Sequence, residues 1–470
     1  MIAGNDASHK YATMVTVVIT AFVTSFSSSA MNLAIPAIGL EFDTKATLIG
    51  WTITGYMLCV AMFAVPFGRI ADLTGRRRIF LIGITTFTVF TGLTFFAWNV
   101  EIILILRILQ GLSCALIFAT NNAILIDAYP GNMRGKVLGF SVTATYFGLS
   151  TGPVFGGLIT HYLGWRYIFL FTVVISLVAM IVALIKLPKA TTDHEEKTKG
   201  AFNVSGNLLY LAMIFCVMYG FSSFAENHFA KILIVVGFAL GVLFMIHELK
   251  TTKPIIKMSL FIGNTSFLLS NLAALFNYGA TFAVGYLMSI YLQLIMGFDS
   301  QIAGIILITQ PLIMALISPF AGRASDKVSP FKLASFGMAL CAVTLFSYTF
   351  LGTEGHLVHI MINLLVVGIG FGVFSSPNTN AVMSCVHPQD YSVASSILAT
   401  MRSLGHTSSM AIITLIMSTN LGNLTFAEAA PEQLVSTMHT CFIVFSIICV
   451  VGVFISLQRK TKHLERDKKS

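Results

Sequence analysis

Long apolar runs separated by short polar segments make up this chain. Residues 51–67 and 81–98 contain no charged side chain, whereas residues 68–80 between them contain four arginines and one aspartate. A run of roughly 20 apolar residues can cross a bilayer as a helix, because a helix satisfies its own backbone hydrogen bonds. The pattern predicts fourteen such helices, at about residues 12–38, 49–67, 79–98, 102–125, 138–160, 166–185, 204–223, 231–247, 266–290, 301–321, 332–351, 357–379, 393–416 and 438–457.

The composition agrees with a helical membrane protein. Of the 470 residues, 56% are hydrophobic and only 10% are charged, and the mean hydropathy is +0.85. A soluble protein has about 25% charged residues. The first apolar run, about residues 12–40, is too long for a signal peptide and is taken as the first span. We therefore expect an all-α membrane protein with fourteen transmembrane helices.

The basic residues give the orientation. An even number of spans places both termini on one side of the membrane. With this arrangement, 23 of the 28 Lys and Arg residues lie on the side of the termini, three lie on the other side and two lie inside spans. Basic loops stay in the cytoplasm, so we expect a multi-pass plasma-membrane protein with cytoplasmic termini. The same bias accounts for the net charge of +9, and no nucleic-acid partner is expected.

No group of residues indicates catalysis or metal binding. The seven cysteines are scattered in or beside apolar runs, without a CxxC pair or a His/Cys cluster. The loops contain no GxSxG turn or phosphate-binding loop, and the adjacent acids Glu195 and Glu196 lie in a polar linker that is expected to be solvated. We expect a protein that is not an enzyme and that holds no metal or cofactor.

Two short motifs recur at similar offsets along the chain. GRIAD at 68–72 returns as GRASD at 322–326, and EFDT at 41–44 returns as GFDS at 297–300. Two parallel repeats of six spans, separated by two additional spans, are typical of transporters. We expect an N-terminal six-helix bundle at 1–185, a cytoplasmic linker at 186–203, two additional helices at 204–257, and a C-terminal six-helix bundle with a cytoplasmic tail at 258–470.

Several further motifs follow one another in a fixed order. They are the loop motif at 68–77 (GRIADLTGRR), LRILQG at 106–111 with Arg107, Gln110 and Gly111, GLSTGPVFGG at 148–157, WTITGYML at 51–58 and GWRYIF at 164–169. With these motifs, nearly the whole chain resembles the major facilitator superfamily, and within it the fourteen-span drug:proton antiporter family of multidrug efflux transporters. One position departs from the family pattern: the acidic residue of the first span is Ser27 here.

The resemblance implies a secondary active transporter that exports small amphipathic molecules or drugs and so confers antibiotic resistance. Two helix bundles would rock around a central cavity, with a proton gradient as the energy source for antiport. We expect it to work as a monomer, with a small amphipathic substrate and the lipid bilayer as its partners. Two alternatives stay open: an exporter of a lipid or an anionic metabolite, and a membrane sensor with a transporter fold that does not transport.

The resemblance also implies a conformational latch near the loop between the second and third spans. Its members are Gly68, Asp72, Gly75, Arg76, Arg77 and Asp127. A charge cluster that forms in one conformation and breaks in the other would hold the two halves together. The alternative is that the arginines serve only as a topology signal. A weaker second copy of the loop consists of Gly322, Arg323 and Asp326.

The fifth-span motif is rich in glycine. Its members are Gly148, Gly152, Pro153, Gly156 and Gly157. Three of the glycines are spaced by four residues and share one helix face, where small residues allow neighbouring helices to approach closely. The proline removes a backbone hydrogen bond and bends the span. The motif thus predicts tight packing, a conformational role, or both.

Three ionisable residues stand inside predicted spans: Arg107, Arg402 and His406. A charge at bilayer depth costs about 2.5–3.5 kcal/mol, so each arginine is expected to face the protein interior or a wet cavity. We predict that these residues, with Gln110 and Asn32, line a basic central cavity or take part in coupling. His406 is either a proton carrier or a structural donor. A basic cavity favours anionic or neutral substrates over quaternary ammonium compounds.

Overall fold

The structure, a computed structural model, is almost entirely helical in the residues that it describes. These are 2–129, 134–187, 203–223, 228–251, 254–256, 260–325, 327–386, 391–422, 424–426 and 428–459. Most of the expected linker at 186–203 lies outside this part of the chain.

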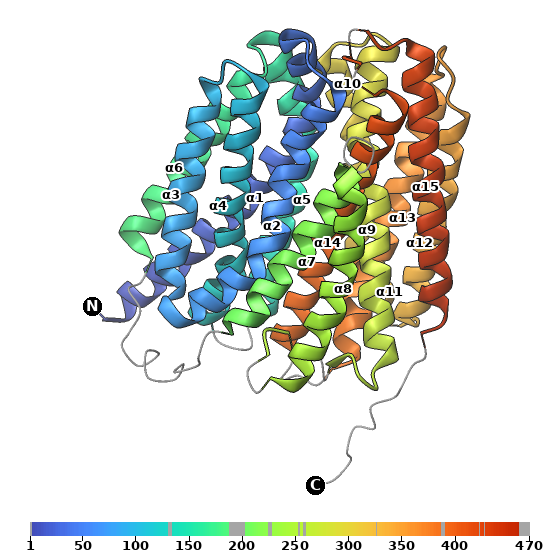
Figure 1. Ribbon diagram of the computed structural model, residues 1–470. Coiled ribbons are helices and arrows are strands. Elements are labelled where there is room, and N and C mark those ends of the chain that lie inside the picture. Colours follow the sequence, from blue (N-terminus) through green and yellow to red (C-terminus); the bar gives the residue numbers. More distant parts are fainter. Residues whose placement is uncertain are drawn as a thin grey trace.

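The helices fall into three groups (Figure 1). The first bundle contains α1 (Ile2–Phe42), α2 (Ala46–Thr74), α3 (Arg76–Phe95), α4 (Val100–Ala128), α5 (Arg134–Tyr162) and α6 (Arg166–Lys186). A hairpin follows, made of α7 (Val204–Ser222) and α8 (His228–Lys250). The second bundle contains α9 (Thr265–Ile290), the π-helical turn η4 (Tyr291–Ile295), α10 (Ser300–Leu307), α11 (Thr309–Ser325), α12 (Pro330–Ser347), the 3-10 turn η5 (Tyr348–Phe350), α13 (Leu357–Ser384), α14 (Tyr391–Asn420) and α15 (Pro431–Leu457).

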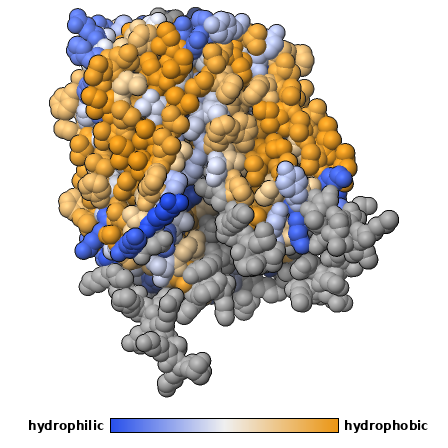
Figure 2. All heavy atoms as spheres, turned by 180° about the vertical axis from the view of Figure 1, so that it is seen from behind, coloured by the Kyte–Doolittle hydropathy of each residue, from blue (hydrophilic) through white to orange (hydrophobic). Residues whose placement is uncertain are grey.

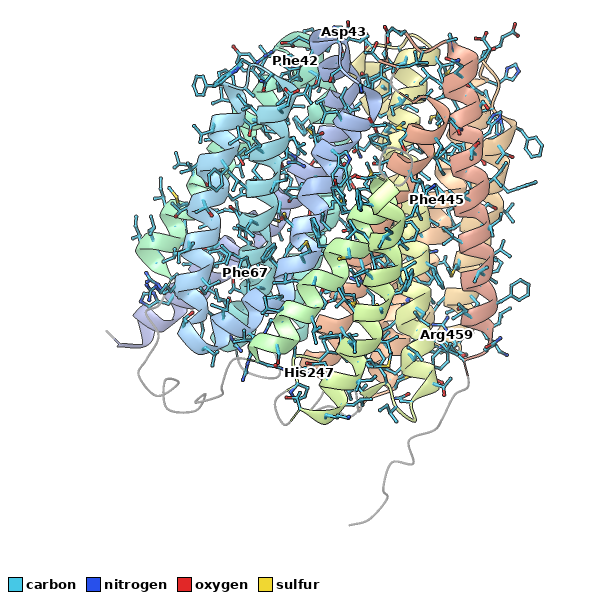
Figure 3. The ribbon with its side chains drawn as sticks, in the orientation of Figure 1. Phe42, Asp43, Phe67, His247, Phe445 and Arg459 are labelled. Carbon is cyan, nitrogen blue, oxygen red and sulfur yellow. The ribbon has the colours of Figure 1, made fainter. Side chains whose placement is uncertain are left out.

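Nearly all helices run along one common direction, so the molecule has two ends (Figure 1). We call the end at which α1 begins and α15 ends the terminal face, and the opposite end the far face. His247 and Arg459 lie near the terminal face, and Phe42 and Asp43 lie at the far face (Figure 3). On the side shown in Figure 2, two hydrophobic areas cover most of the height, a paler band runs between them, and hydrophilic residues lie towards the ends. This distribution fits a protein surrounded by lipid.

Within the described residues, twelve helices are long and apolar enough to cross a membrane. The continuous stretch Ser300–Ser325, formed by α10 and α11, is one of them. Helices α5 and α14 are not among the twelve. Both are rich in Gly, Ser and Thr, which suit contacts between helices but lower the hydropathy. The count of fourteen spans therefore stays a prediction.

Polar side chains mark where several helices begin. Asn99, Asn203, Asn264 and Asp299 each accept a hydrogen bond from a backbone N–H in the first turn of the following helix. Such caps satisfy donors that the helix itself leaves unpaired. Gly75 separates α2 from α3 with a φ of 102°, a conformation that glycine adopts readily.

The α7–α8 hairpin lies in front of the gap between the two bundles (Figure 1). Helix α7 packs on both α2 and α14, and the Tyr210 hydroxyl donates to the Ala61 carbonyl at 2.9 Å. At the terminal face, the buried carboxylate of Glu248 accepts from the backbone N–H groups of Ile255 and Ile256 at 2.6 and 3.0 Å. This acid therefore ties the hairpin to the segment that leads into α9.

Arg459, which the sequence places among the basic residues of the tail, is buried just after α15 with 6% exposure. Its guanidinium donates to Asn378 Oδ1 on α13 at 2.7 Å, to Ser270 Oγ on α9 at 3.2 Å and to the Phe331 carbonyl on α12 at 3.3 Å. Burial lowers the pKa of Arg459 to about 10, so the group stays charged at neutral pH. It fastens four helices of the second bundle together at the terminal face.

Candidate functional site at the seam between the bundles

The two bundles meet along a seam through backbone and hydroxyl groups. Ser289 Oγ on α9 donates to the Asn32 carbonyl on α1 at 2.6 Å. Thr407 Oγ1 on α14 donates to the Met57 carbonyl on α2 at 3.1 Å. His161 Nδ1, at the end of α5, lies 3.8 Å from Asp299 Oδ2, just before α10. The predicted site residue Asn32 therefore lies at the seam, with its side chain 8% exposed.

The glycines of α5 contact two different partners. A Cβ on Gly148 would lie 2.5 Å from the Phe22 carbonyl oxygen, and a Cβ on Gly152 would lie 2.6 Å from Ser29 Cβ. A Cβ on Gly156 would lie 2.9 Å from Ala30 Cβ. These three glycines thus form the surface against which α1 packs, as their spacing by four indicates.

Gly157 instead faces the second bundle. A Cβ there would lie 2.2 Å from the Ser300 carbonyl oxygen, and one on Gly304 of α10 would lie 2.1 Å from the Pro153 carbonyl oxygen. Ser300 Oγ also donates to the Gly157 carbonyl at 3.2 Å. The α5 and α10 backbones are therefore in direct contact near the far face, and either glycine can be replaced only if the bundles move apart.

A polar cluster around Arg402 lies at the seam, nearer to the terminal face than the contact between α5 and α10. Arg402 lies 11 residues into α14, which is about 17 Å from the end of that helix at the terminal face. Its Nη2 donates to Thr379 Oγ1 on α13 at 2.7 Å, and its guanidinium lies 5.1 Å from the ring centroid of Tyr278 on α9. The side chain is half-buried, and its Nε is buried without a hydrogen-bond partner.

Aromatic rings continue the cluster along α14 and α9. The His406 ring lies one turn after Arg402 and stacks on Phe282, with centroids 4.6 Å apart and an interplanar angle of 30°. It also lies 5.6 Å from the Tyr278 ring. Arg402 and His406 are thus brought together, as predicted from their spacing on one helix.

One residue of the first bundle reaches this cluster. The Tyr146 hydroxyl on α5 is 2.9 Å from Ser375 Oγ on α13. Ser375 Oγ is also 3.0 Å from the Tyr278 hydroxyl. Ser375 therefore connects tyrosines from the two bundles. The cluster lies at the surface where they meet.

Arg107 and Gln110 occupy a different environment from the one we expected. They are 1% and 0% exposed, respectively. Arg107 donates to Gln110 Oε1 at 2.9 Å and to the Thr52 carbonyl at 3.3 Å, and its guanidinium lies 4.1 Å from the Tyr56 ring centroid. Gln110 in turn donates to Thr94 Oγ1 at 2.7 Å. All these partners belong to α2, α3 and α4, so this pair lies inside the first bundle and does not line a cavity shared with Arg402.

Only part of the predicted latch is described. Arg77 donates to the carbonyls of Leu187 and Leu184, at the end of α6, at 3.0 and 3.4 Å. The side chains of Asp72 and Asp127 lie outside the described part of the chain, and so does Asp326 of the second copy. Gly68 and Gly75 lie towards the end of α2 and directly after it.

In the second copy, a Cβ on Gly322 would lie 2.6 Å from Ser376 Oγ on α13, and the neighbouring Arg323 is exposed in the last turn of α11. Among the described residues, no group of three His, Cys, Asp or Glu side chains is placed to hold a metal ion. The charged or ionisable side chains described at the seam are Arg402, His406 and the His161–Asp299 pair.

Sequence reasoning missed several seam residues. Tyr278, Ser375 and Thr379 surround Arg402, but each is an ordinary polar residue within an apolar run. Gly304 gave one usable signal, because it follows the repeated GFDS motif by a short distance. The backbone contact that it makes with α5 depends on the arrangement of the two bundles, which no local pattern specifies.

Comparison with known proteins gives a family match over most of the chain. The family model described as Major Facilitator Superfamily matches residues 17–410 and 271–470. The riboflavin transporter RibZ of Clostridioides difficile is 27% identical over 458 residues, which are 96% of this chain and 98% of the relative. The tetracenomycin C resistance and export protein of Streptomyces glaucescens is 23% identical over 418 residues, with coverages of 87% and 76%. Multidrug resistance protein Stp of Mycobacterium tuberculosis is 23% identical over 397 residues, with coverages of 83% and 73%.

Solved structures share the fold. A peptide transporter POT in complex with sulfate has a TM-score of 0.67 and 14% identity, covering 95% of this chain and 94% of its own. A bacterial homolog of the human lysosomal transporter Spinster has the same TM-score and identity, covering 95% and 96%. At this level of identity the likeness concerns the fold alone.

Proposed function

Because the chain belongs to the Major Facilitator Superfamily, we propose that this transporter exports small amphipathic molecules by alternating access, driven by proton antiport. It is a transporter and not an enzyme. The relatives include two proteins named for drug resistance and one named for riboflavin. By analogy with these relatives, the expected substrate is a small, partly apolar organic molecule.

The observation that carries the proposal is the direct backbone contact of Gly157 on α5 with Ser300 and Gly304 on α10. Besides the backbone atoms, this contact has one hydrogen bond from Ser300 Oγ to the Gly157 carbonyl and the His161–Asp299 pair beside it, so few interactions must break when the bundles separate there. The half-buried Arg402 cluster lies at the same seam, farther from the far face. Separation at one face and contact at the other would expose this cluster to each side in turn.

A pair of glycine substitutions tests this mechanism. Gly157→Ala places a Cβ 2.2 Å from the Ser300 carbonyl oxygen, whereas Gly92→Ala in α3 places one 3.6 Å from Val173 Cγ2, an ordinary contact. Both changes replace a helical glycine by alanine, so they share any gain in helix propensity. We expect the transport rate to fall by about tenfold or more for Gly157→Ala, because the added Cβ keeps the two bundles from their correct positions. The rate should stay near the wild-type value for Gly92→Ala. Equal transport by both variants would contradict the closing role of this contact.

Proton coupling is tested in proteoliposomes that contain a pH-sensitive dye. A panel of tetraphenylphosphonium, riboflavin and an aromatic sulfonate covers cationic, neutral and anionic amphiphiles. Movement of protons that depends on a member of the panel is expected under an imposed pH gradient. An absence of movement with every member would favour the sensor alternative over transport.

Two further features belong to the same proposal. The first is topology: fourteen spans, two six-helix bundles with α7 and α8 as an addition, and the terminal face in the cytoplasm of a plasma-membrane protein. A cysteine introduced at Lys231, which the sequence places outside, should react with an impermeant reagent added to intact cells. Protection of that cysteine would reverse the orientation.

The second feature is the latch between Asp72, Arg76 and Asp127. If their charges hold one conformation, Asp72→Asn will slow turnover while the protein still inserts into the membrane. Turnover at the wild-type rate would leave the arginines of this loop with a topological role only.

A further inference from the structure

The cluster around Arg402 has more hydrogen-bonding capacity than the described residues use. A guanidinium carries five N–H donors in a rigid fork. Within the described part of the chain, Arg402 makes one hydrogen bond, to Thr379, and its Nε is left without a partner. None of the described acidic side chains forms an ion pair with it. Ionisable side chains within transmembrane segments commonly mark substrate or ion pathways.

The surroundings of Arg402 select for an acidic group. Its positive charge repels a cation, and this repulsion is stronger at a half-buried position than in bulk water. A carboxylate or sulfonate suits the guanidinium fork, since it accepts two parallel hydrogen bonds. The Tyr278 ring centroid lies 5.1 Å from the same guanidinium, and its hydroxyl can donate to an acid bound beside the ring.

The surroundings of His406 select for a flat ring. His406 and Phe282 form a stacked pair, and both are half-buried at the seam. Tyr278 packs edge-on against Phe371, with centroids 4.9 Å apart, which fixes the orientation of its ring. Stacking on aromatic walls favours a planar aromatic ligand over an aliphatic one of similar size.

From these contacts, we propose that the seam holds a subsite for a planar aromatic molecule with one acidic group. Arg402 and the Tyr278 hydroxyl bind the acid, and the stacked rings of His406 and Phe282 bind the aromatic plane. This subsite rests on the proposed transport function and names the class of substrate within it.

Binding there also affects the contact between the bundles. The Tyr278 hydroxyl now shares Ser375 Oγ with Tyr146 of the first bundle. An acid that accepts from Tyr278 draws this hydroxyl away from Ser375 and changes the hydrogen bond that Tyr146 makes across the seam. The ligand is thereby linked to the movement of the two bundles through three named side chains.

The test is a binding measurement on the purified full-length protein in micelles, with calorimetry as the readout. The probes are naphthalene-2-sulfonate, the matched neutral naphthalene-2-sulfonamide, and cyclohexanesulfonate, which keeps the acid but is not planar. The wild type should bind the aromatic sulfonate about tenfold more tightly than either of the other two.

Variants separate the two halves of the subsite. Arg402→Met should lower the affinity for the aromatic sulfonate by about tenfold and leave the affinity for the sulfonamide within about threefold of the wild-type value. His406→Leu should keep the preference for the acid and lose the preference for the planar ring. Lys250→Met removes one positive charge from an exposed position at the end of α8, and it should leave all three affinities unchanged.

Equal binding of sulfonate and sulfonamide by the wild type would overturn the subsite, as would an unchanged sulfonate affinity in Arg402→Met. The proteoliposome assay distinguishes this failure from failure of the proposed function. Proton-coupled flux of other amphiphiles without anion selectivity would overturn the subsite alone. Selective binding without any coupled flux would overturn the export function alone.

Discussion

Each bundle holds an arginine beside a tyrosine ring. The two guanidinium groups differ in how far the surrounding residues bury them. Arg107 of the first bundle is 1% exposed, donates to Gln110 at 2.9 Å and lies 4.1 Å from the Tyr56 ring. Arg402 of the second bundle is half-buried, has one hydrogen bond to protein within the described residues, and lies 5.1 Å from the Tyr278 ring. The first guanidinium is enclosed on all sides by one bundle, whereas the second faces the seam.

The difference shows how one residue type serves two purposes in a membrane. A guanidinium whose neighbours are carbonyls, an amide and a ring is a structural connector, because little of it remains to bind anything else. A guanidinium whose donors the described residues leave unused, at the surface between the two bundles, suits the proposed ligand subsite. Substitution of Arg107 should therefore lower mainly the stability of the protein, whereas substitution of Arg402 should lower mainly its affinity for a ligand.

The largest expected effect is on the stability of the first bundle. Arg107→Ala removes a buried side chain, ends its contact with Tyr56 and leaves Gln110 Oε1 without its donor. The free energy of unfolding should fall by about 3 kcal/mol, as for other large-to-small changes in a core. Arg402→Ala should cost less than about 1 kcal/mol, since its side chain is partly exposed. Reversible unfolding in mixed micelles, followed by circular dichroism, measures both. A larger loss for Arg402→Ala would invert the comparison.

Arg459 provides a second case of an enclosed arginine. It is 6% exposed and bonds to α9, α12 and α13, so it should behave like Arg107. We expect Arg459→Ala to lower the free energy of unfolding by about 2 kcal/mol, because its partners are left buried and unpaired. The affinity for naphthalene-2-sulfonate should stay at the wild-type value. A changed affinity with unchanged stability would place Arg459 in the ligand pathway.

The sequence predicts the helical membrane fold and the family well, for physical reasons. Apolar runs of the length of a bilayer can only be helices, and motifs such as 148–157 are contiguous. The four-residue spacing of Gly148, Gly152 and Gly156 correctly indicates one packing face, which the structure places on α1. Local patterns of this kind depend on helix geometry alone.

The candidate site was harder to predict, because it depends on which faces of distant helices meet. Arg107 and Arg402 look alike in sequence: each is a lone charge in an apolar run. Only the structure shows that Gln110 and Tyr56 enclose the first, and that the second lies beside Tyr278, whose hydroxyl shares Ser375 with Tyr146 of the other bundle. Arg459 shows the opposite error, since a basic residue at the start of a polar tail is usually solvated and here is buried.

A substitution at Thr379, which accepts a hydrogen bond from Arg402, can give the guanidinium an acidic partner within the protein. Thr379→Asp places a carboxylate next to the guanidinium, where it competes with an acidic ligand. The affinity for naphthalene-2-sulfonate should fall by about tenfold, equivalent to 1.4 kcal/mol. Thr379→Asn has nearly the same shape without the charge and should keep the affinity within about threefold. Equal losses for Asp and Asn would mean that shape, and not charge, governs this site.

The smallest expected effect comes from removing one hydroxyl beside each arginine. Tyr278→Phe keeps the ring next to Arg402 but ends the hydrogen bond to Ser375, so it should lower both stability and sulfonate affinity by about 1 kcal/mol. Tyr56→Phe keeps the ring that faces Arg107, and the attraction between the cation and the ring does not need the hydroxyl. It should change stability by less than about 0.5 kcal/mol and leave sulfonate binding unchanged. If the two changes had the same effect on binding, the hydroxyl of Tyr278 would have no part in holding an acid, and Arg402 would have to bind it alone.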